Sequence, residues 1–109
     1  MNDPRALRRA FFAALKVGLK VVWPVLSGLI VLIVSLGIVI GELEGWSLNE
    51  SIYFSFVTGL TIGYGDFAPK TPLTRALAVV IGLCGLLLTG LVAAVAVKAL
   101  TAVVDDSKK

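Results

Sequence analysis

Two long runs without a charged residue constrain the fold of this chain more than any other feature. The first lies between Lys20 and Glu42, and the second lies between Arg75 and Lys98. At about 1.5 Å per residue, about 20 helical residues cover the roughly 30 Å hydrocarbon core of a bilayer. The apolar share of the 109 residues, 58%, also exceeds the roughly 45–50% of soluble domains. We therefore expect an all-α membrane protein with two transmembrane helices.

The scarcity of reactive side chains disfavours several classes of function. The chain has one cysteine, Cys84, and no histidine, so it cannot close an internal disulfide or build a cluster of thiolate and imidazole metal ligands. It also lacks the residue that most often serves in acid–base catalysis. We therefore expect no enzymatic activity. Cys84 is expected to be a small packing residue rather than a redox sensor.

The first twenty residues combine a helix start with a basic face. Asp3 and Pro4 have the pattern of an N-cap and a first-turn proline, which predicts an amphipathic helix over 4–20. At about 100° per residue its basic residues project to one side: Arg5, Arg8, Arg9, Lys16 and Lys20. Either this helix lies under the bilayer and transmits a cytoplasmic signal, or it is a positive flank that keeps the N-terminus in the cytoplasm. Anionic lipid, and not nucleic acid, is the expected partner.

The uncharged run that follows predicts an outer transmembrane helix over 21–41. Trp23 suits a headgroup interface, and Pro24 gives the chain a place to change direction near the helix start. A cleaved signal peptide is the alternative, because basic residues precede the apolar run. The run is longer than a typical signal core, however, and no small-residue cleavage pattern follows it. Glu42 and Glu44 then mark the outer surface.

A shorter helix is predicted over 47–60. Ser47 and Glu50 have the spacing of a capping box. About three turns, or about 18 Å, are too few to cross a bilayer, so the segment must enter the membrane and return. A re-entrant helix needs protein or water around it, and the partial negative charge of its C-terminal end would favour a cation. An interfacial or buried amphipathic helix is the alternative.

The next six residues, Thr61–Asp66, form an extended run that is rich in glycine. Their carbonyl groups would have no helical or sheet partner, which is too costly in hydrocarbon, so they must line water or an ion. Gly63 and Gly65 permit the positive-φ backbone that turns successive carbonyls the same way. A ring of such carbonyls can replace the water shell of a potassium ion. The alternative is a glycine-rich turn that joins two helices.

An inner transmembrane helix is predicted over 73–101, after a polar turn bracketed by Pro69 and Pro72. Both termini would then be cytoplasmic, with a solvated, frayed tail and no ligand-binding domain after it. Spacings of three and four residues place one stripe on a single face, where it would line a pore: Leu86, Thr89, Ala93, Val97 and Thr101. The constriction is expected among the last three of these and Ala94, while Lys98 falls one step off the face.

The run Thr61-Ile62-Gly63-Tyr64-Gly65-Asp66, with a capped half-helix before it and a glycine-rich span after it, resembles the filter of pore-loop potassium channels. The likeness is to the two-transmembrane bacterial class and covers about residues 24–101. Four further positions stand at that family's distances from the filter: Pro69, Arg75, Gly85 and Gly90. The resemblance implies a potassium-selective channel of the plasma membrane, assembled as a homotetramer around a path for potassium ions.

The resemblance also implies roles for single residues. The stretch from Thr61 to Gly65 would form the filter, in which the carbonyls of the first four residues and the threonine hydroxyl surround dehydrated potassium. The side chains of Ile62 and Tyr64 would wedge the loop from behind, and Asp66 would add negative charge at the outer mouth. Three residues of the half-helix would support the filter: Tyr53, Phe54 and Val57.

The sequence departs from the family pattern around the filter. Val57 stands where some relatives have a glutamate bonded to the filter aspartate, so Asp66 must find another partner or water. Phe54 lacks the hydrogen-bond donor of an aromatic pair that often braces the filter tyrosine. Ala68 stands where channels sensitive to external tetraethylammonium have an aromatic ring. Without four such rings, external block is expected to be weak.

Three glycines of the inner helix have two interpretations each. The position that matches Gly85 is the bend that lets inner helices splay in the family, and Gly90 is a second candidate hinge. Close helix packing through small residues is the alternative for both, and also for Gly82.

Two other functions stay open at this point. The first is a weakly selective cation channel, which the intact run Thr61–Gly65 argues against. The second is a non-conducting scaffold or accessory subunit that assembles through its small-residue helix. The chain has no arginine-studded span to sense voltage and no nucleotide or calcium motif, so the sequence predicts no gating stimulus.

Overall fold

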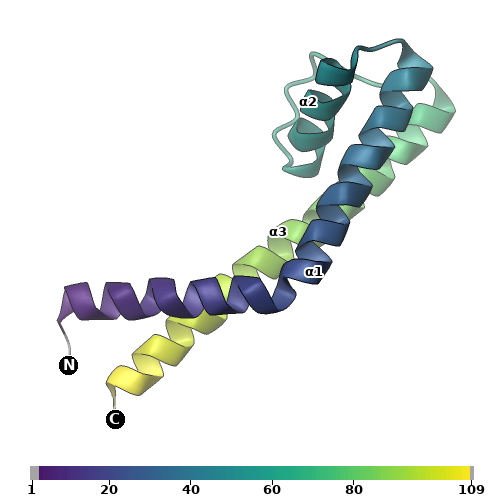
Figure 1. Ribbon diagram of the computed structural model, residues 1–109. Coiled ribbons are helices and arrows are strands. Elements are labelled where there is room, and N and C mark those ends of the chain that lie inside the picture. Colours follow the sequence, from purple (N-terminus) through teal and green to yellow (C-terminus); the bar gives the residue numbers. More distant parts are fainter. Residues whose placement is uncertain (1–2, 109) are drawn as a thin grey trace. The chain divides into compact units, whose positions relative to one another are not determined.

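A computed structural model describes residues 3–108, which form three helices and, within that range, no strand (Figure 1). The helices are α1 (Pro4–Glu44), α2 (Leu48–Gly59) and α3 (Pro72–Ser107). Two of them, α1 and α3, are long and apolar enough to cross a membrane. The expected all-α architecture with two long apolar helices is confirmed.

Helix α1 runs without interruption from Pro4 to Glu44, so the segments 4–20 and 21–41 belong to one helix. At its start, Asp3 Oδ1 accepts the backbone N–H of Arg5 at 3.1 Å. Pro24 lies inside the helix and does not end it. A proline removes one backbone hydrogen bond, and the apolar residues on both sides keep the rest of the helix favourable in a membrane.

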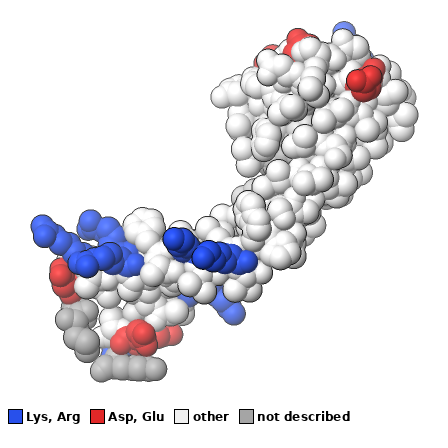
Figure 2. All heavy atoms as spheres, in the orientation of Figure 1, with Lys and Arg blue, Asp and Glu red and all other residues white. Residues whose placement is uncertain are grey.

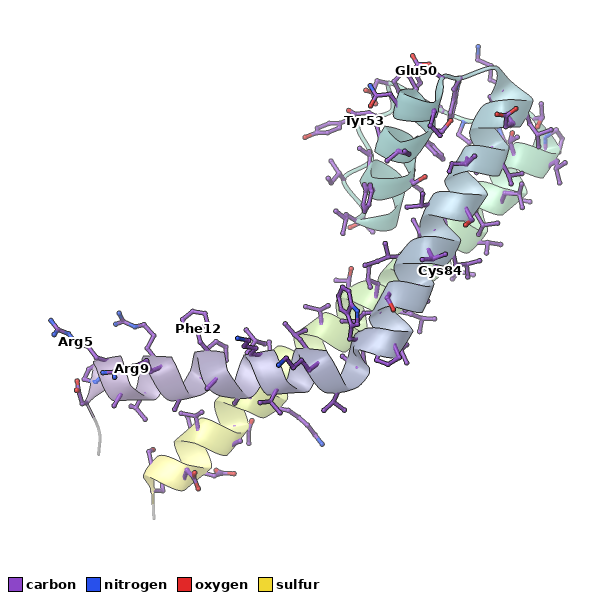
Figure 3. The ribbon with its side chains drawn as sticks, in the orientation of Figure 1. Arg5, Arg9, Phe12, Glu50, Tyr53 and Cys84 are labelled. Carbon is purple, nitrogen blue, oxygen red and sulfur yellow. The ribbon has the colours of Figure 1, made fainter. Side chains whose placement is uncertain are left out.

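The contacts divide the chain into two compact units, and Ser27–Thr89 forms the larger one. In the other unit, the N-terminal part of α1 packs on the C-terminal part of α3. A Cβ atom added at Gly18 would lie 2.7 Å from Val95 Cγ1, so the two helices approach closely there. Lysine and arginine side chains project from this part of α1 (Figure 2), among them Arg5 and Arg9 (Figure 3).

In the larger unit, α2 packs beside α1 through small residues. Gly37 and Gly41 on α1 face Ser55 and Ser51 on α2, and a Cβ atom at either glycine would overlap the facing serine hydroxyl. Both serines are buried, at 0% and 2% exposure. Ser55 Oγ donates to the Ser51 carbonyl at 2.8 Å, and Ser51 Oγ donates to the Ser47 carbonyl at 2.9 Å. The serines therefore meet the glycines without an unsatisfied polar atom.

The apolar core of this unit contains residues from all three helices: Ile33, Ile40, Phe54, Ile81 and Cys84. Cys84 is 7% exposed and unpaired by any disulfide, which agrees with the expectation of a small packing residue. The core fixes α2 against both long helices.

Helix α3 begins with a threonine pair and continues past its expected end. Thr71 Oγ1 accepts the backbone N–H of Thr74 at 3.2 Å, and Pro72 takes the first helical position. The helix extends to Ser107 rather than 101, so the expectation of a frayed tail was wrong up to that residue. No glycine or proline occurs over 91–107, and alanine-rich sequence continues a helix readily.

Candidate functional site

The candidate site is the irregular segment between the C-terminal end of α2 and the first turn of α3. Its inner end is tied to α2, because the Val57 carbonyl accepts the backbone N–H of Ile62 at 2.9 Å and that of Gly63 at 3.2 Å. Thr61 N–H donates to the Thr58 carbonyl at 3.2 Å. The side chain of Val57 is 8% exposed. Val57 thus holds the segment through its backbone carbonyl, because its side chain has no hydrogen-bonding atom.

The backbone of this segment alternates in the sign of φ. Thr61, Gly63 and Gly65 have φ values of 60°, 62° and 82°, whereas Ile62 and Tyr64 between them have negative φ. Two of the three positive values fall on glycine, as expected. The third falls on a β-branched residue, for which this region is a genuine outlier that costs of order 1–3 kcal/mol. Such strain is found where a site dictates the backbone conformation.

The side chains of the segment are open to the surroundings in the single chain. Ile62 is 49% exposed and Tyr64 is 70% exposed, so neither wedges against its own chain. Thr61 Oγ1 donates to the Leu60 carbonyl at 2.6 Å. Its oxygen keeps its lone pairs and can still accept or coordinate.

Asp66 has a partner on the short helix. Tyr53 donates a hydrogen bond to the Asp66 carboxylate, and this bond raises the pKa of Tyr53. Figure 3 shows Tyr53 projecting from α2 on the side away from α1. Because position 57 is valine and not glutamate, Asp66 needs another partner. That partner is Tyr53, one helical turn before Val57.

Four aromatic residues lie behind the outer part of the segment. Trp46 packs on Phe54 with ring centroids 4.9 Å apart and on Phe67 at 5.4 Å. Tyr53 lies 6.0 Å from Phe67, with the rings inclined by 75°. Phe54 is 4% exposed. Its ring packs on Trp46, which in turn packs on Phe67 directly after the segment Thr61–Asp66.

The outer end of the segment is tied to the end of α1. Glu44 Oε2 accepts the backbone N–H of Lys70 at 2.9 Å and the hydroxyl of Thr74 at 2.7 Å. Thr74 is fully buried. The Lys70 N–H, followed by the Thr74 hydroxyl, lowers the pKa of Glu44. Arg75 Nε donates to the Pro69 carbonyl at 3.3 Å. Glu44 thus joins three parts of the chain at this end of the molecule.

The three glycines of α3 have different surroundings. A Cβ atom at Gly85 would overlap the carbonyl of Gly59, at the end of α2. At Gly82 and Gly90, an added Cβ would meet nothing within 4 Å. Within this chain, close packing therefore explains Gly85 and does not explain the other two.

The stripe expected to line a pore is exposed at every position. Leu86 is 60% exposed and Val97 is 62% exposed, and Thr89, Ala93 and Thr101 are exposed as well. Neither unit covers its part of the stripe with its own chain.

Sequence reasoning missed several residues that shape this site. Gly37 and Gly41 carry a readable signal, since small residues four apart mark close helix packing. Trp46 and Phe67 carry none, because aromatic residues near a membrane surface are ordinary. Glu44 was assigned only to the outer surface, and its partners are 26 and 30 residues away.

A family model described as "Ion channel" matches residues 28–102. That range includes α2, the segment Thr61–Asp66 and nearly all of α3. The chain belongs to the ion channel family. Together with the two long apolar helices, this membership makes it a membrane protein.

Its relatives in this channel family are named as potassium channels. "Probable potassium channel protein 2" of Methanocaldococcus jannaschii is 47% identical over 51 residues, which are 47% of this chain and 15% of the relative. "Potassium channel subfamily K member 16" of Homo sapiens is 41% identical over 44 residues, 40% of this chain and 14% of the relative. "Two-pore potassium channel 5" of Arabidopsis thaliana is 46% identical over 55 residues, 46% of this chain and 14% of the relative.

The likeness is confined to one part of each relative. The chain covers only 14–15% of the length of these three relatives. No solved structure matches the chain.

Proposed function

We propose that this chain is the pore of a potassium-selective channel that conducts K⁺ passively across a membrane. The alternation of φ along Thr61–Gly65 carries the proposal. In an ordinary strand successive carbonyls face opposite sides. Alternating the sign of φ removes that reversal and lets them face one side, as a potassium filter requires. A glycine-rich helix connection does not need a strained threonine.

The filter would use the carbonyls of four residues, Thr61 to Tyr64, with the Thr61 hydroxyl at the inner end and Gly65 as the outer turn. Two backbone bonds to Val57 support its inner half. The end of α2, which carries partial negative charge, points toward the inner end of the filter and favours a cation there. Asp66 adds negative charge at the outer mouth.

One chain supplies one wall of such a path, so we propose a homotetramer around the ions. The exposed side chains support this assembly, because Ile62 and Tyr64 are large, largely apolar, and 49% and 70% exposed. Neighbouring copies would cover them and wedge the filter from behind. Cyclic closure of identical chains is the usual form of oligomer.

The inner path would be lined by the exposed stripe of α3, whose members are apolar or hydroxyl-bearing: Leu86, Thr89, Ala93, Val97 and Thr101. Narrowing at the last three of these, or at Ala94, would gate the path by dewetting. Of the two candidate hinges, Gly90 has open space for a change of backbone angle, whereas Gly85 is confined by Gly59.

The charges support an orientation with both termini in the cytoplasm. The basic residues of 5–20 precede the first span, and lysine and arginine beside a span favour its cytoplasmic side. Acidic residues follow the span at Glu42, Glu44 and Glu50. We propose that anionic headgroups of the plasma membrane meet the basic residues of α1. An apolar groove in the same unit, with Lys98 among its lining residues, offers room for an acyl chain.

Flux from potassium-loaded liposomes containing the purified protein tests the proposal. Potassium efflux that barium blocks, without equal sodium efflux, supports it. Equal sodium flux would indicate a weakly selective cation channel. No flux of either ion would indicate a scaffold or accessory subunit.

A further inference from the structure

The connection between α1 and α2 reaches the outer part of the filter through aromatic rings. Trp46 lies in this connection, and its ring packs on Phe67 at 5.4 Å with the planes inclined by 71°. Phe67 directly follows Asp66, the last residue of the filter motif. The Trp46 ring is itself held by Phe54, which is buried in the core of the larger unit. A rigid part of the fold therefore touches the filter segment at Phe67.

Few other contacts hold this part of the segment. The backbone bonds to Val57 end at Gly63, and the bond to Glu44 begins at Lys70. Among the described residues, no backbone N–H from Tyr64 through Ala68 has a hydrogen-bond partner in the chain. The side chains of that stretch make the Tyr53–Asp66 hydrogen bond, and Phe67 packs on Trp46, on Tyr53 and on the apolar core of the unit.

We propose that Trp46 is a positioning residue that holds the outer half of the filter through Phe67 and so prolongs the conducting conformation. A shift of the outer half of the filter would draw Phe67 away from Trp46, so the two rings would touch in only one of the two conformations. A contact made in only one of two conformations favours that conformation. Inclined aromatic pairs at such distances shift an equilibrium by a few-fold to about tenfold. This inference rests on the proposed potassium conduction.

Amide hydrogen exchange tests the contact without depending on conduction. The purified full chain in potassium-containing liposomes would be compared as wild type, Trp46→Ala and Trp46→Phe, with Trp23→Ala as a matched control. Trp23 is 57% exposed and lies in the other unit. We expect Trp46→Ala to speed exchange by about three- to tenfold at Gly63 and Lys70, the hydrogen-bonded amides on either side of the stretch 64–68. Trp46→Phe keeps a ring and should restore most of the protection, and Trp23→Ala should leave it unchanged.

Two further measurements separate positioning from a loss of folding. Raising the potassium concentration should slow the exchange of Trp46→Ala, because ions in the filter hold its carbonyls in place, whereas an unfolded chain would not respond. Trp46→Ala should add little once Phe67 is already alanine, since the two rings act as one contact. In single-channel recordings, Trp46→Ala should shorten conducting periods by a similar factor.

Unchanged exchange at Gly63 and Lys70 in Trp46→Ala would overturn the proposal. Faster exchange spread evenly through α1 and α2 would also overturn it, and so would additive effects of Trp46→Ala and Phe67→Ala. A wild-type protein that passes no potassium, but in which the protection of the Gly63 and Lys70 amides still depends on Trp46, would refute the proposed function and support the contact. Normal potassium conduction, with exchange that Trp46→Ala leaves unchanged, would support the proposed function and refute the role of Trp46.

Discussion

Gly85 of α3 packs directly on the backbone of Gly59 at the end of α2. A Cβ atom at Gly85 would lie 2.9 Å from Gly59 Cα and would overlap the Gly59 carbonyl. The neighbour is backbone, which cannot swing aside as a flexible side chain can. The inner end of the filter begins two residues after Gly59. Helix α3 at Gly85 is therefore in contact with the C-terminal end of α2, which directly precedes the proposed filter.

Alanine at Gly85 is expected to destabilise the protein by about 1–3 kcal/mol or more, because it overpacks this contact. Alanine at Gly90 meets open space and should stabilise the helix by about 0.5–1 kcal/mol. The thermal unfolding of both variants in detergent, followed by circular dichroism, measures the difference. Equal stability of Gly85→Ala and Gly90→Ala would show that Gly59 and Gly85 are not in contact.

The packing of α2 on α1 through Gly41 gives a second prediction. Alanine at Gly41 would overlap Ser51, which is 2% exposed and has no room to move. We expect a loss of about 1–3 kcal/mol and a displaced filter. Gly28→Ala is the matched control, because an added Cβ there meets nothing within 4 Å. Thermal unfolding of the pair tests the packing, and a control as unstable as Gly41→Ala would contradict it.

Glu44 makes the outer end of the filter segment sensitive to acid. Its partners Lys70 and Thr74 lower its pKa from the usual value of 4.5. The carboxylate therefore stabilises the folded protein above that value, and this contribution is lost as the pH falls through the lowered pKa. The protection of the Lys70 amide, relative to its intrinsic exchange rate at each pH, should fall over that range.

Glu44→Gln should remove this acid dependence. Its Lys70 amide should exchange faster than in the wild type at neutral pH, and the difference should shrink below pH 4.5. Glu42→Gln, two residues away on an exposed side chain, serves as the control. If the acid dependence persists in Glu44→Gln, a titrating group other than Glu44 causes it.

Tyr53→Phe should loosen the filter at its outer mouth. The substitution keeps the ring contact with Phe67 and removes the hydrogen bond to Asp66. We expect conducting periods in single-channel recordings to become several-fold shorter, while potassium selectivity is retained. Unchanged conducting periods would show that Asp66 is held well enough without Tyr53.

Much of the fold could be predicted from local sequence signals. The uncharged runs indicate the two long helices, and Ser47 with Glu50 indicates the start of α2, where the structure has the expected capping box. The predicted end of α3 at 101 differs from the observed end at Ser107, because a position near the chain terminus suggests fraying although no glycine or proline over 102–107 breaks the helix. Pro24 suggests a break between two helices, but α1 continues through it. The residues on both sides of Pro24 decide this continuity, and the proline alone does not show it.

The support of the candidate site was less predictable, since it depends on contacts between distant residues. The sequence shows that Val57 replaces the glutamate found in some relatives. It does not show that Tyr53 is the partner of Asp66 instead. Positive φ was expected at Gly63 and Gly65, which tolerate it, and not at Thr61, which does not. Strain of that kind is imposed by the surrounding structure and leaves no local signal.

The reversal potential under bi-ionic conditions tests the central claim most directly. The purified protein would be placed in a planar bilayer with potassium on one side and sodium on the other at equal concentration. If Thr61–Gly65 forms a potassium-selective filter, the reversal potential will lie on the side of the potassium equilibrium potential. It will be displaced from zero by about 59 mV for each tenfold preference for potassium over sodium. A reversal potential at zero would contradict the account.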